Sequence, residues 1–293
     1  MKIKVTSDST CDLSQDLVRK YDIGIVPLIV NMDGESLLDG VTVTQKDIFS
    51  FTARTGKLCS TAAVNEESYR EYFAPLAAEY DAVIHINISA EFSSCYQNAC
   101  AAAKAFDNVY VIDSRNLSSG QGHIVIEAAQ LAGAGQLTPE QICDELRDLT
   151  GRVESSFLLD RLDYMKKGGR CSSVEVLGAN LLKLKPCIEV VDGKMRVAKK
   201  YRGAYNRCIQ DYVTERISGR TDLRADRMFI THGLARDGQR VGLGARPWPR
   251  TAGSSTCTRP KPAARSAATA ARTRWACCSS TKSRTRDRSL LKR

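Results

Sequence analysis

The chain has 293 residues, of which 43% are hydrophobic and 26% are charged, values that are ordinary for a soluble globular protein. This length is enough to bury a full hydrophobic core and predicts two domains. No apolar run is long enough to cross a bilayer and the N-terminus lacks the layout of a signal peptide, so we expect a cytoplasmic protein without stable membrane insertion.

The positive charge is concentrated at one end of the chain. The 43 Lys and Arg residues and the 33 Asp and Glu residues leave a net charge of +10. Residues 236–293 hold 15 of the basic and two of the acidic residues, so they carry +13 while residues 1–235 carry −3. Because residues 236–293 also lack helical or strand periodicity, they are either a basic extension that contacts nucleic acid or anionic lipid, or a segment never selected to fold. The mildly acidic body predicts no nucleic-acid partner.

The eleven cysteines do not predict a metal site. They form no Cys-x-x-Cys pair, and His85, His123 and His232 do not cluster with them along the chain. We expect most of them to be small buried hydrophobic residues in a reducing cytosol. The Gly-Gln-Gly of residues 120–122 is too short for a dinucleotide-binding motif, so we expect no cofactor.

Residues 1–150 alternate short apolar segments with helical patterns. Capping residues predict helix starts after Asp12 or Ser14, at Thr44 and at Thr138. The other expected elements are strands at 3–6, 23–30, 82–88 and 109–112, a loop at 59–63, a helix from about residue 66, and helices that end near residues 104 and 134. This rhythm predicts an α/β fold. The N-terminal domain at residues 1–152 should have three layers, with a mostly parallel sheet between two layers of helices.

The rhythm changes after Gly151. Asp192-Gly193 between two apolar runs is the strongest hairpin signal in the chain. The expected elements are strands at 156–159, 187–191, 194–201 and 228–231, and helices at 160–167, 172–184 and 203–217. They predict a smaller C-terminal α/β domain with antiparallel pairing at residues 153–235, which is incomplete, followed by the basic tail at 236–293.

A basic block lies inside this second domain. Lys166, Lys167 and Arg170 surround the glycine pair at residues 168–169, and Lys183 and Lys185 follow. The glycines allow a tight turn, and the planar guanidinium of arginine suits a carboxylate or phosphate. The block therefore predicts an anion held in a crevice.

Hydroxyl pairs follow several of the predicted strands, at the edge where such folds bind ligands. The pairs are Ser9-Thr10, Ser60-Thr61, Ser93-Ser94 and Ser118-Ser119. Each pair alone is best interpreted as a helix cap. Four pairs on one predicted edge favour an anion site that includes Ser60, Thr61, Ser93 and Ser94.

Ser93 also raises the alternative of an enzyme, a serine-based esterase or acyl-phosphate hydrolase. It lacks the Gly-x-Ser-x-Gly turn of such nucleophiles. His85 lies within an apolar strand pattern and is expected to be a core histidine, so no histidine is placed by pattern to act as the base.

Five sequence elements together resemble the DegV family of bacterial fatty-acid-binding proteins, across residues 1 to about 235. They are Ser7-Asp8-Ser9 with Asp12-Leu13, Val26-Pro27-Leu28 with Asp39-Gly40, residues 93–97, Asp113-Ser114 with Gly120 and Gly122, and residues 162–170 with Lys185-Pro186.

The resemblance implies two α/β domains with a long-chain fatty acid between them. It implies that Ser93 and the backbone of Ser94 hold the carboxylate, with Ser60 or Thr61 beside it and Arg170 nearby. A separate fatty acid kinase would phosphorylate the bound carboxylate, so the protein would be a carrier in phospholipid precursor metabolism and not an enzyme. Candidates for the kinase-facing surface are Lys166, Lys167 and Lys194.

This chain departs from the family pattern at three places. Ser60-Thr61-Ala62-Ala63 replaces the family's Thr-Ser-Gln-Pro, and Ser94-Cys95 replaces its Gly-Thr. The family's C-terminal His-x-Gly-Pro is missing. We hypothesise that the tail is the same gene translated out of frame. Codons can be chosen for residues 257–280 such that translation from the third base of the Cys257 codon gives a different peptide. That peptide contains His-Cys-Gly-Pro followed by Leu-Gly-Val-Leu-Phe-Ile.

Overall fold

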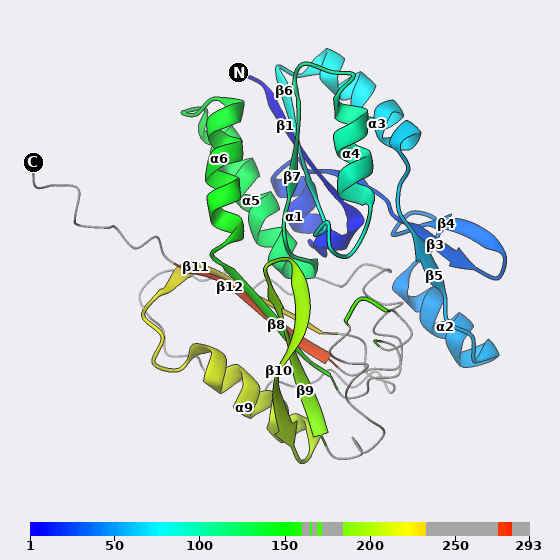
Figure 1. The fold of residues 1–293 in the computed structure, drawn as a ribbon, viewed down its shortest axis with the longest axis vertical. Coiled ribbons are helices and arrows are strands. Elements are labelled where there is room, and N and C mark those ends of the chain that lie inside the picture. Colours follow the sequence, from blue (N-terminus) through cyan, green and yellow to red (C-terminus); the bar gives the residue numbers. More distant parts are fainter. Residues whose placement is uncertain (160–164, 166–168, 172–183, 233–274, 283–293) are drawn as a thin grey trace, which may run out of the picture.

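The computed structural model describes residues 1–159, 165, 169–171, 184–232 and 275–282. It contains two α/β domains that lie one above the other in Figure 1. The boundary at residues 152–153, between the last helix of the first domain and the first strand of the second, stays a prediction. The expected helices 160–167 and 172–184, and with them Lys166, Lys167 and Lys183, lie outside the described residues.

The first domain is built on a parallel sheet, as the sequence predicted. Its strands stand in the order β2-β1-β6-β7. They are β1 (Ile3–Asp8), β2 (Gly24–Val26), β6 (Ala82–Asn87) and β7 (Val109–Asp113). Every residue of β6 is buried, because helices cover both faces of the sheet.

Helices form the outer layers of this domain. In Figure 1, α5 (Ser118–Ala134) and α6 (Pro139–Thr150) lie on one side of the sheet, with α3 (Glu66–Glu79) and α4 (Cys95–Ala103) on the other. The shorter elements are η1 (Ser9–Cys11), α1 (Gln15–Lys20) and α2 (Gln45–Thr55). The capping boxes expected at Thr44 and Thr138 are both present, which confirms these helix starts.

The expected strand at residues 23–30 is wrong, because Pro27 divides it. Proline has no N–H to donate to a sheet, so β2 ends at Val26 and β3 (Ile29–Met32) belongs to another sheet. There β3 pairs antiparallel with β4 (Glu35–Leu38) and with β5 (Ser60–Ala62), which replaces the expected loop at 59–63. This small sheet extends from the first domain beside α2.

The second domain contains a five-stranded antiparallel sheet in the order β10-β9-β8-β12-β11. Its strands are β8 (Val153–Leu159), β9 (Leu184–Val191), β10 (Lys194–Arg202), β11 (Leu223–His232) and β12 (Trp275–Lys282). The turn between β9 and β10 is at Asp192 and Gly193, both with positive φ, which confirms the predicted hairpin.

The two faces of this sheet have different partners. On one face, α9 (Tyr205–Ile217) covers Leu158 and Cys187. On the other face, Phe157, Leu159 and Ile188 form a second apolar cluster. Val190 packs with residues of the first domain, so apolar contacts join the two domains.

Strand β12 lies in the tail that we expected to have no strand. It pairs with β8 on one side and β11 on the other, with Cys277 opposite both Phe157 and Thr231. A strand with neighbours on both sides has its backbone hydrogen bonds satisfied by tertiary pairing, and such pairing leaves no periodic mark in its sequence.

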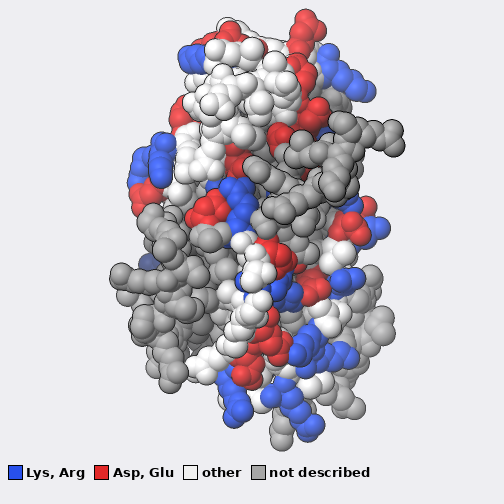
Figure 2. All heavy atoms as spheres, turned by 90° about the vertical axis from the view of Figure 1, so that its left-hand side faces the viewer, with Lys and Arg blue, Asp and Glu red and all other residues white. Residues whose placement is uncertain are grey.

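The described surface is mixed in charge. Figure 2 shows acidic and basic side chains interspersed over the face that it presents. Several of them are paired, as in Arg147–Asp144 and Arg220–Glu154. Within the described part of the chain, no helix combines the length and apolar character needed to cross a membrane. Of the eight cysteines whose side chains the structure describes, six are buried, as expected, and none of these eight forms a disulfide.

Candidate functional site

The start of α4 carries the first two predicted site residues. Ser93 is half-buried, and its Oγ accepts a hydrogen bond from the backbone N–H of Cys95 (3.3 Å) and donates to the Cys95 Sγ (3.1 Å). Ser94 is the exposed N-cap residue and makes no side-chain cap bond. Free N–H groups at a helix start attract anions, so this end of α4 can hold a carboxylate next to Ser93.

Ser60 and Thr61 lie on β5, whose continuation packs on α4. Ser60 is exposed and Thr61 is half-buried. Beyond β5, the carbonyl of Val64 accepts a hydrogen bond from Asn98 Nδ2 of α4 (2.7 Å). Val64 also belongs to the same apolar cluster as Cys95. The structure thus joins the segment that carries Ser60 and Thr61 to the helix that begins beside Ser93.

Arg170 lies in a short described segment of the second domain. It is exposed, and the neighbouring Cys171 is buried, with its Sγ donating to the backbone carbonyl of Met195 on β10 (3.7 Å). Met195 in turn packs against the cluster that contains Phe92 and Cys95. The segment of Arg170 is therefore linked through Met195 to the domain that carries Ser93.

A series of apolar packing contacts leads away from this polar end. Phe92, next to Ser93, belongs to the cluster of the first domain against which Met195 packs. Met195 also packs against the cluster of Phe157 and Ile188 in the second domain. The remaining members of this second cluster are Leu159, Met165 and Cys171, with Val197 packed against them. A polar helix start next to an apolar interface between the domains matches the chemistry of an alkyl chain with an acidic head group.

A buried carboxylate fixes the strand ends beneath the loop of Ser93. Asp8 is fully buried, and its Oδ2 accepts from the backbone N–H of Ile88 (2.7 Å). Its Oδ1 accepts from the backbone N–H of Thr10 (3.1 Å) and from Gln121 Nε2 (3.0 Å). Several donors offset the cost of burying the charge, so Asp8 ties the ends of β1 and β6 to α5.

Sequence reasoning missed this role. Asp8 entered only as part of the Ser7-Asp8-Ser9 motif, and Gln121 only as the centre of the Gly-Gln-Gly that is too short for a dinucleotide-binding motif. The available signal was a glutamine between two glycines at the start of an apolar helix, a position where a polar side chain can meet the ends of neighbouring strands.

His85 is a core histidine, as predicted. It is completely buried, its Nδ1 shares a hydrogen bond with Thr6 Oγ1 (2.8 Å), and its ring packs edge-on against Tyr69 and Phe73. Burial lowers its pKa to about 4, although the nearby Asp8 acts to raise it. The described hydrogen bonds of Ser93 involve Cys95 and no histidine.

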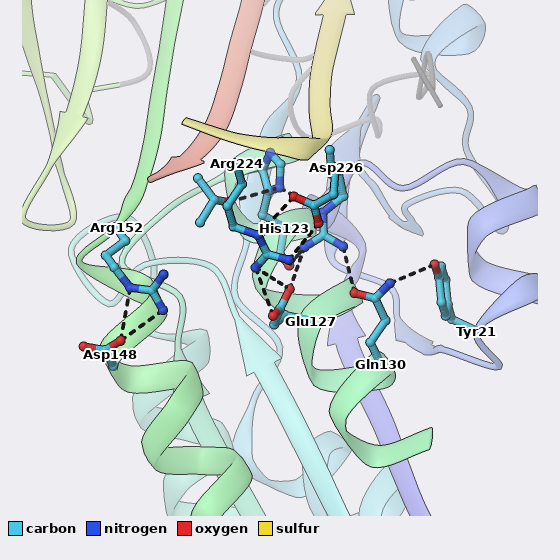
Figure 3. A network of polar contacts seen from close by, with 10 residues as sticks. Tyr21, His123, Glu127, Gln130, Asp148, Arg152, Arg224 and Asp226 are labelled. Atoms are coloured by element: carbon cyan, nitrogen blue, oxygen red, sulfur yellow. Dashed lines mark hydrogen bonds and ion pairs between the residues drawn. The ribbon is translucent and has the colours of Figure 1, made fainter. Parts of the chain in front are cut away.

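An ionic network joins α5 to β11 (Figure 3). Glu127 of α5 accepts hydrogen bonds from Arg224 Nη1 (3.0 Å) and Arg227 Nη2 (2.9 Å) of β11. Arg227 Nε also donates to the Nδ1 of the buried His123 (3.1 Å), and Arg224 pairs with Asp226 (2.7 Å). These residues, some 100 positions apart, fasten the second sheet to a helix of the first domain, and no motif in the sequence indicated them.

The fold and this arrangement define a two-domain α/β protein with a candidate ligand site between a helix start in one domain and an apolar sheet face in the other. A model of the DegV family, described as uncharacterised proteins, matches residues 2–238. The chain belongs to the DegV family.

Relatives support the same assignment. A DegV domain-containing protein from Clostridium perfringens is 36% identical over 204 residues, which are 69% of this chain and 73% of that protein. Protein DegV from Bacillus subtilis is 30% identical over 190 residues, 64% of this chain and 68% of that protein.

Solved structures share the fold. A DegV family protein from Thermus thermophilus, described by its fatty acid binding, has a TM-score of 0.80 at 25% identity, over 96% of this chain and 100% of that one. A protein from Eubacterium ventriosum described as binding stearic acid has a TM-score of 0.76 at 22% identity, over 95% of this chain and 98% of that one.

Proposed function

We propose that this protein binds a long-chain fatty acid between its two domains. The observation that carries the proposal is the series of apolar packing contacts that runs from Phe92, beside Ser93, through Met195 to the cluster of Phe157 in the second sheet. Burying an alkyl chain there would gain about 0.8 kcal/mol per methylene group, so a long chain would bind more tightly than a short one. Fatty acid binding in the structure from Thermus thermophilus supports the proposal.

The carboxylate would lie at the start of α4. Ser93 Oγ would donate to one of its oxygens, and the backbone N–H of Ser94 would donate to the other. Ser60 or Thr61 would approach from the β5 side, and the guanidinium of Arg170 would balance the charge from the second domain. The exposure of Ser94 and Arg170 supports this placement, because an anion can reach them from solvent.

The protein would act as a carrier in the cytoplasm and not as an enzyme. It would present the bound carboxylate to a separate fatty acid kinase, for phospholipid precursor metabolism, with Lys194 of β10 as a candidate contact. The alternative is a serine-based esterase or acyl-phosphate hydrolase that uses Ser93, whose Oγ donates to the Cys95 Sγ in this structure.

The test is a titration of the delipidated protein with a fluorescent long-chain fatty acid. Ser93→Ala removes one hydrogen bond to a charged group, so we expect its dissociation constant to rise by roughly 10- to 100-fold. Ser36→Ala is the matched control, because Ser36 is an exposed serine of the small sheet whose Oγ donates to Asn31 Oδ1 (2.8 Å). Wild-type protein that binds no fatty acid, or Ser93→Ala that binds as tightly as wild type, would refute the proposal. Labelling of Ser93 by a fluorophosphonate would favour the hydrolase instead.

A further inference from the structure

We propose that the tip of the β9–β10 hairpin is a latch that gates the fatty-acid site. The inference rests on the proposed function and adds to it how the ligand enters and leaves. The latch consists of Ser89, Glu91 and Arg115 of the first domain with the hairpin residues 192–194 of the second.

Three polar contacts hold the tip. Ser89 is completely buried, and its Oγ donates to the backbone carbonyl of Gly193 (2.9 Å). Arg115 pairs with Asp192 (3.1 Å), and Lys194 pairs with Glu91 (3.4 Å). The loops that follow β6 and β7 in the first domain are therefore both in contact with one turn of the second.

The turn fits closely against Ser89. A Cβ on Gly193 would lie 2.7 Å from Ser89 Oγ, well inside van der Waals contact, and Gly193 has a φ of +79°, where a side chain is strained. Glycine is thus needed at this position both for the turn and for the approach of the two domains. The strongest hairpin signal in the sequence coincides with an interdomain contact.

The latch acts on the loop that carries the carboxylate site. Ser89 and Ser93 belong to the same short connection between β6 and α4, within which the backbone N–H of Phe92 donates to the Ser89 carbonyl (2.9 Å). Behind the tip, Val190 of the hairpin packs in the same apolar cluster as Phe92. Release of the hairpin would therefore uncover Phe92 and free the loop that positions Ser93.

The two ends of the domain interface differ in strength. At α5 and β11, the side chains of Glu127 and Arg227 are only 20% and 11% exposed, and each makes several charged hydrogen bonds. At the latch, the side chains of Asp192 and Lys194 are 83% and 67% exposed, and ion pairs in that setting contribute little. The bond from Ser89 to Gly193 is the buried polar contact of the latch, so the domains would open there and pivot about α5 and β11.

Ser89→Ala tests the latch through the kinetics of fatty-acid exchange. The variant loses the interdomain bond to Gly193, and also the bond that Ser89 Oγ accepts from the backbone N–H of Glu91 (3.3 Å) within the first domain. Loss of the interdomain bond should raise the population of the open form by roughly fivefold. The substitution removes no proposed contact to the fatty acid and weakens the closed form of the free and of the bound protein alike, so we expect the association and dissociation rate constants to rise together by about this factor, with the dissociation constant within about twofold of wild type. The control is Tyr212→Phe. The buried Tyr212 hydroxyl donates to the backbone carbonyl of Ser156 (2.7 Å), so this variant also loses a buried hydrogen bond, but one that lies wholly within the second domain. It should leave both rate constants unchanged.

Two results would overturn the latch. If Ser89→Ala raised the dissociation rate constant alone, Ser89 would be a binding residue and not a gate; if neither constant changed, the hairpin would not control access. Hydrogen exchange of the ligand-free protein distinguishes a failure of the latch proposal from a failure of the proposed fatty-acid binding. Peptides covering residues 88–92 and 190–195 should exchange about fivefold faster in Ser89→Ala than in Tyr212→Phe, whether or not the protein binds fatty acid.

Discussion

Acidification should destabilise this protein through His85. The unfolded chain binds a proton at this histidine with a pKa of 6.5, whereas burial lowers the pKa in the folded protein to about 4. Between these values the unfolded state binds more protons, so the free energy of unfolding falls as the pH falls. The contribution is fully present above pH 6.5 and is lost as the pH decreases toward 4.

The size of the effect follows from these two pKa values. Between pH 7.5 and pH 5 the histidine should cost about 2 kcal/mol of the free energy of unfolding. Of the neighbours of His85, Asp8 favours its protonation, whereas the rings of Tyr69 and Phe73 bury it and contribute no compensating charge. Nε2 of His85 has no hydrogen-bond partner among the described residues, so a proton there would be buried without an acceptor.

The assay is urea unfolding followed by circular dichroism at pH 7.5 and pH 5. The comparison is a Thr6→Val/His85→Phe double variant, which removes both partners of their buried hydrogen bond together and keeps an aromatic ring between Tyr69 and Phe73. Carboxylates elsewhere titrate in both proteins, so the wild type should lose about 2 kcal/mol more than the variant. Equal losses in the two proteins would refute the assignment of the acid sensitivity to His85.

Two further predictions concern α5 and the tail. Gly120→Ala should lower the free energy of unfolding by about 2 kcal/mol, because its Cβ would overlap Asn116 Oδ1 and Ser155 Oγ. Gly133→Ala in the same helix has open space and should raise it by up to about 1 kcal/mol; urea midpoints in the opposite order would contradict the packing described here. Sequencing the gene across codons 230–293 should reveal a single-base slip that restores His-Cys-Gly-Pro, whereas an uninterrupted frame as printed would make the basic tail genuine.

The slip would also explain the composition of β12. Both of its neighbours are strands of the same sheet, and interior strands are usually apolar. The strand instead reads Trp-Ala-Cys-Cys-Ser-Ser-Thr-Lys. The alternative frame places Leu-Gly-Val-Leu-Phe-Ile over the codons for residues 274–280, where β12 lies. An apolar segment at that position is what a central strand requires.

The residues of the candidate site could be predicted from the sequence, but the way in which the two domains bring them together could not. Ser93 and Ser94 follow a buried strand, and that local pattern was enough to place them at the start of a helix. Their relation to Arg170 depends on Met195, which is over 100 residues from Ser93 along the chain and packs in both domains. No local pattern reports such a contact, because it depends on how two separate sheets pack against each other.

The family, the α/β rhythm and the local elements could be predicted from the residues, since caps such as Thr44 and the turn at Asp192-Gly193 act within a few residues. Three features could not be predicted in this way and emerge only from the folded chain: the division at Pro27 between two sheets, the place of β12 and the pairing of Glu127 with β11. A capping bond is formed by neighbours along the chain, whereas a strand's place in a sheet and a buried ion pair depend on which distant surfaces exclude water together.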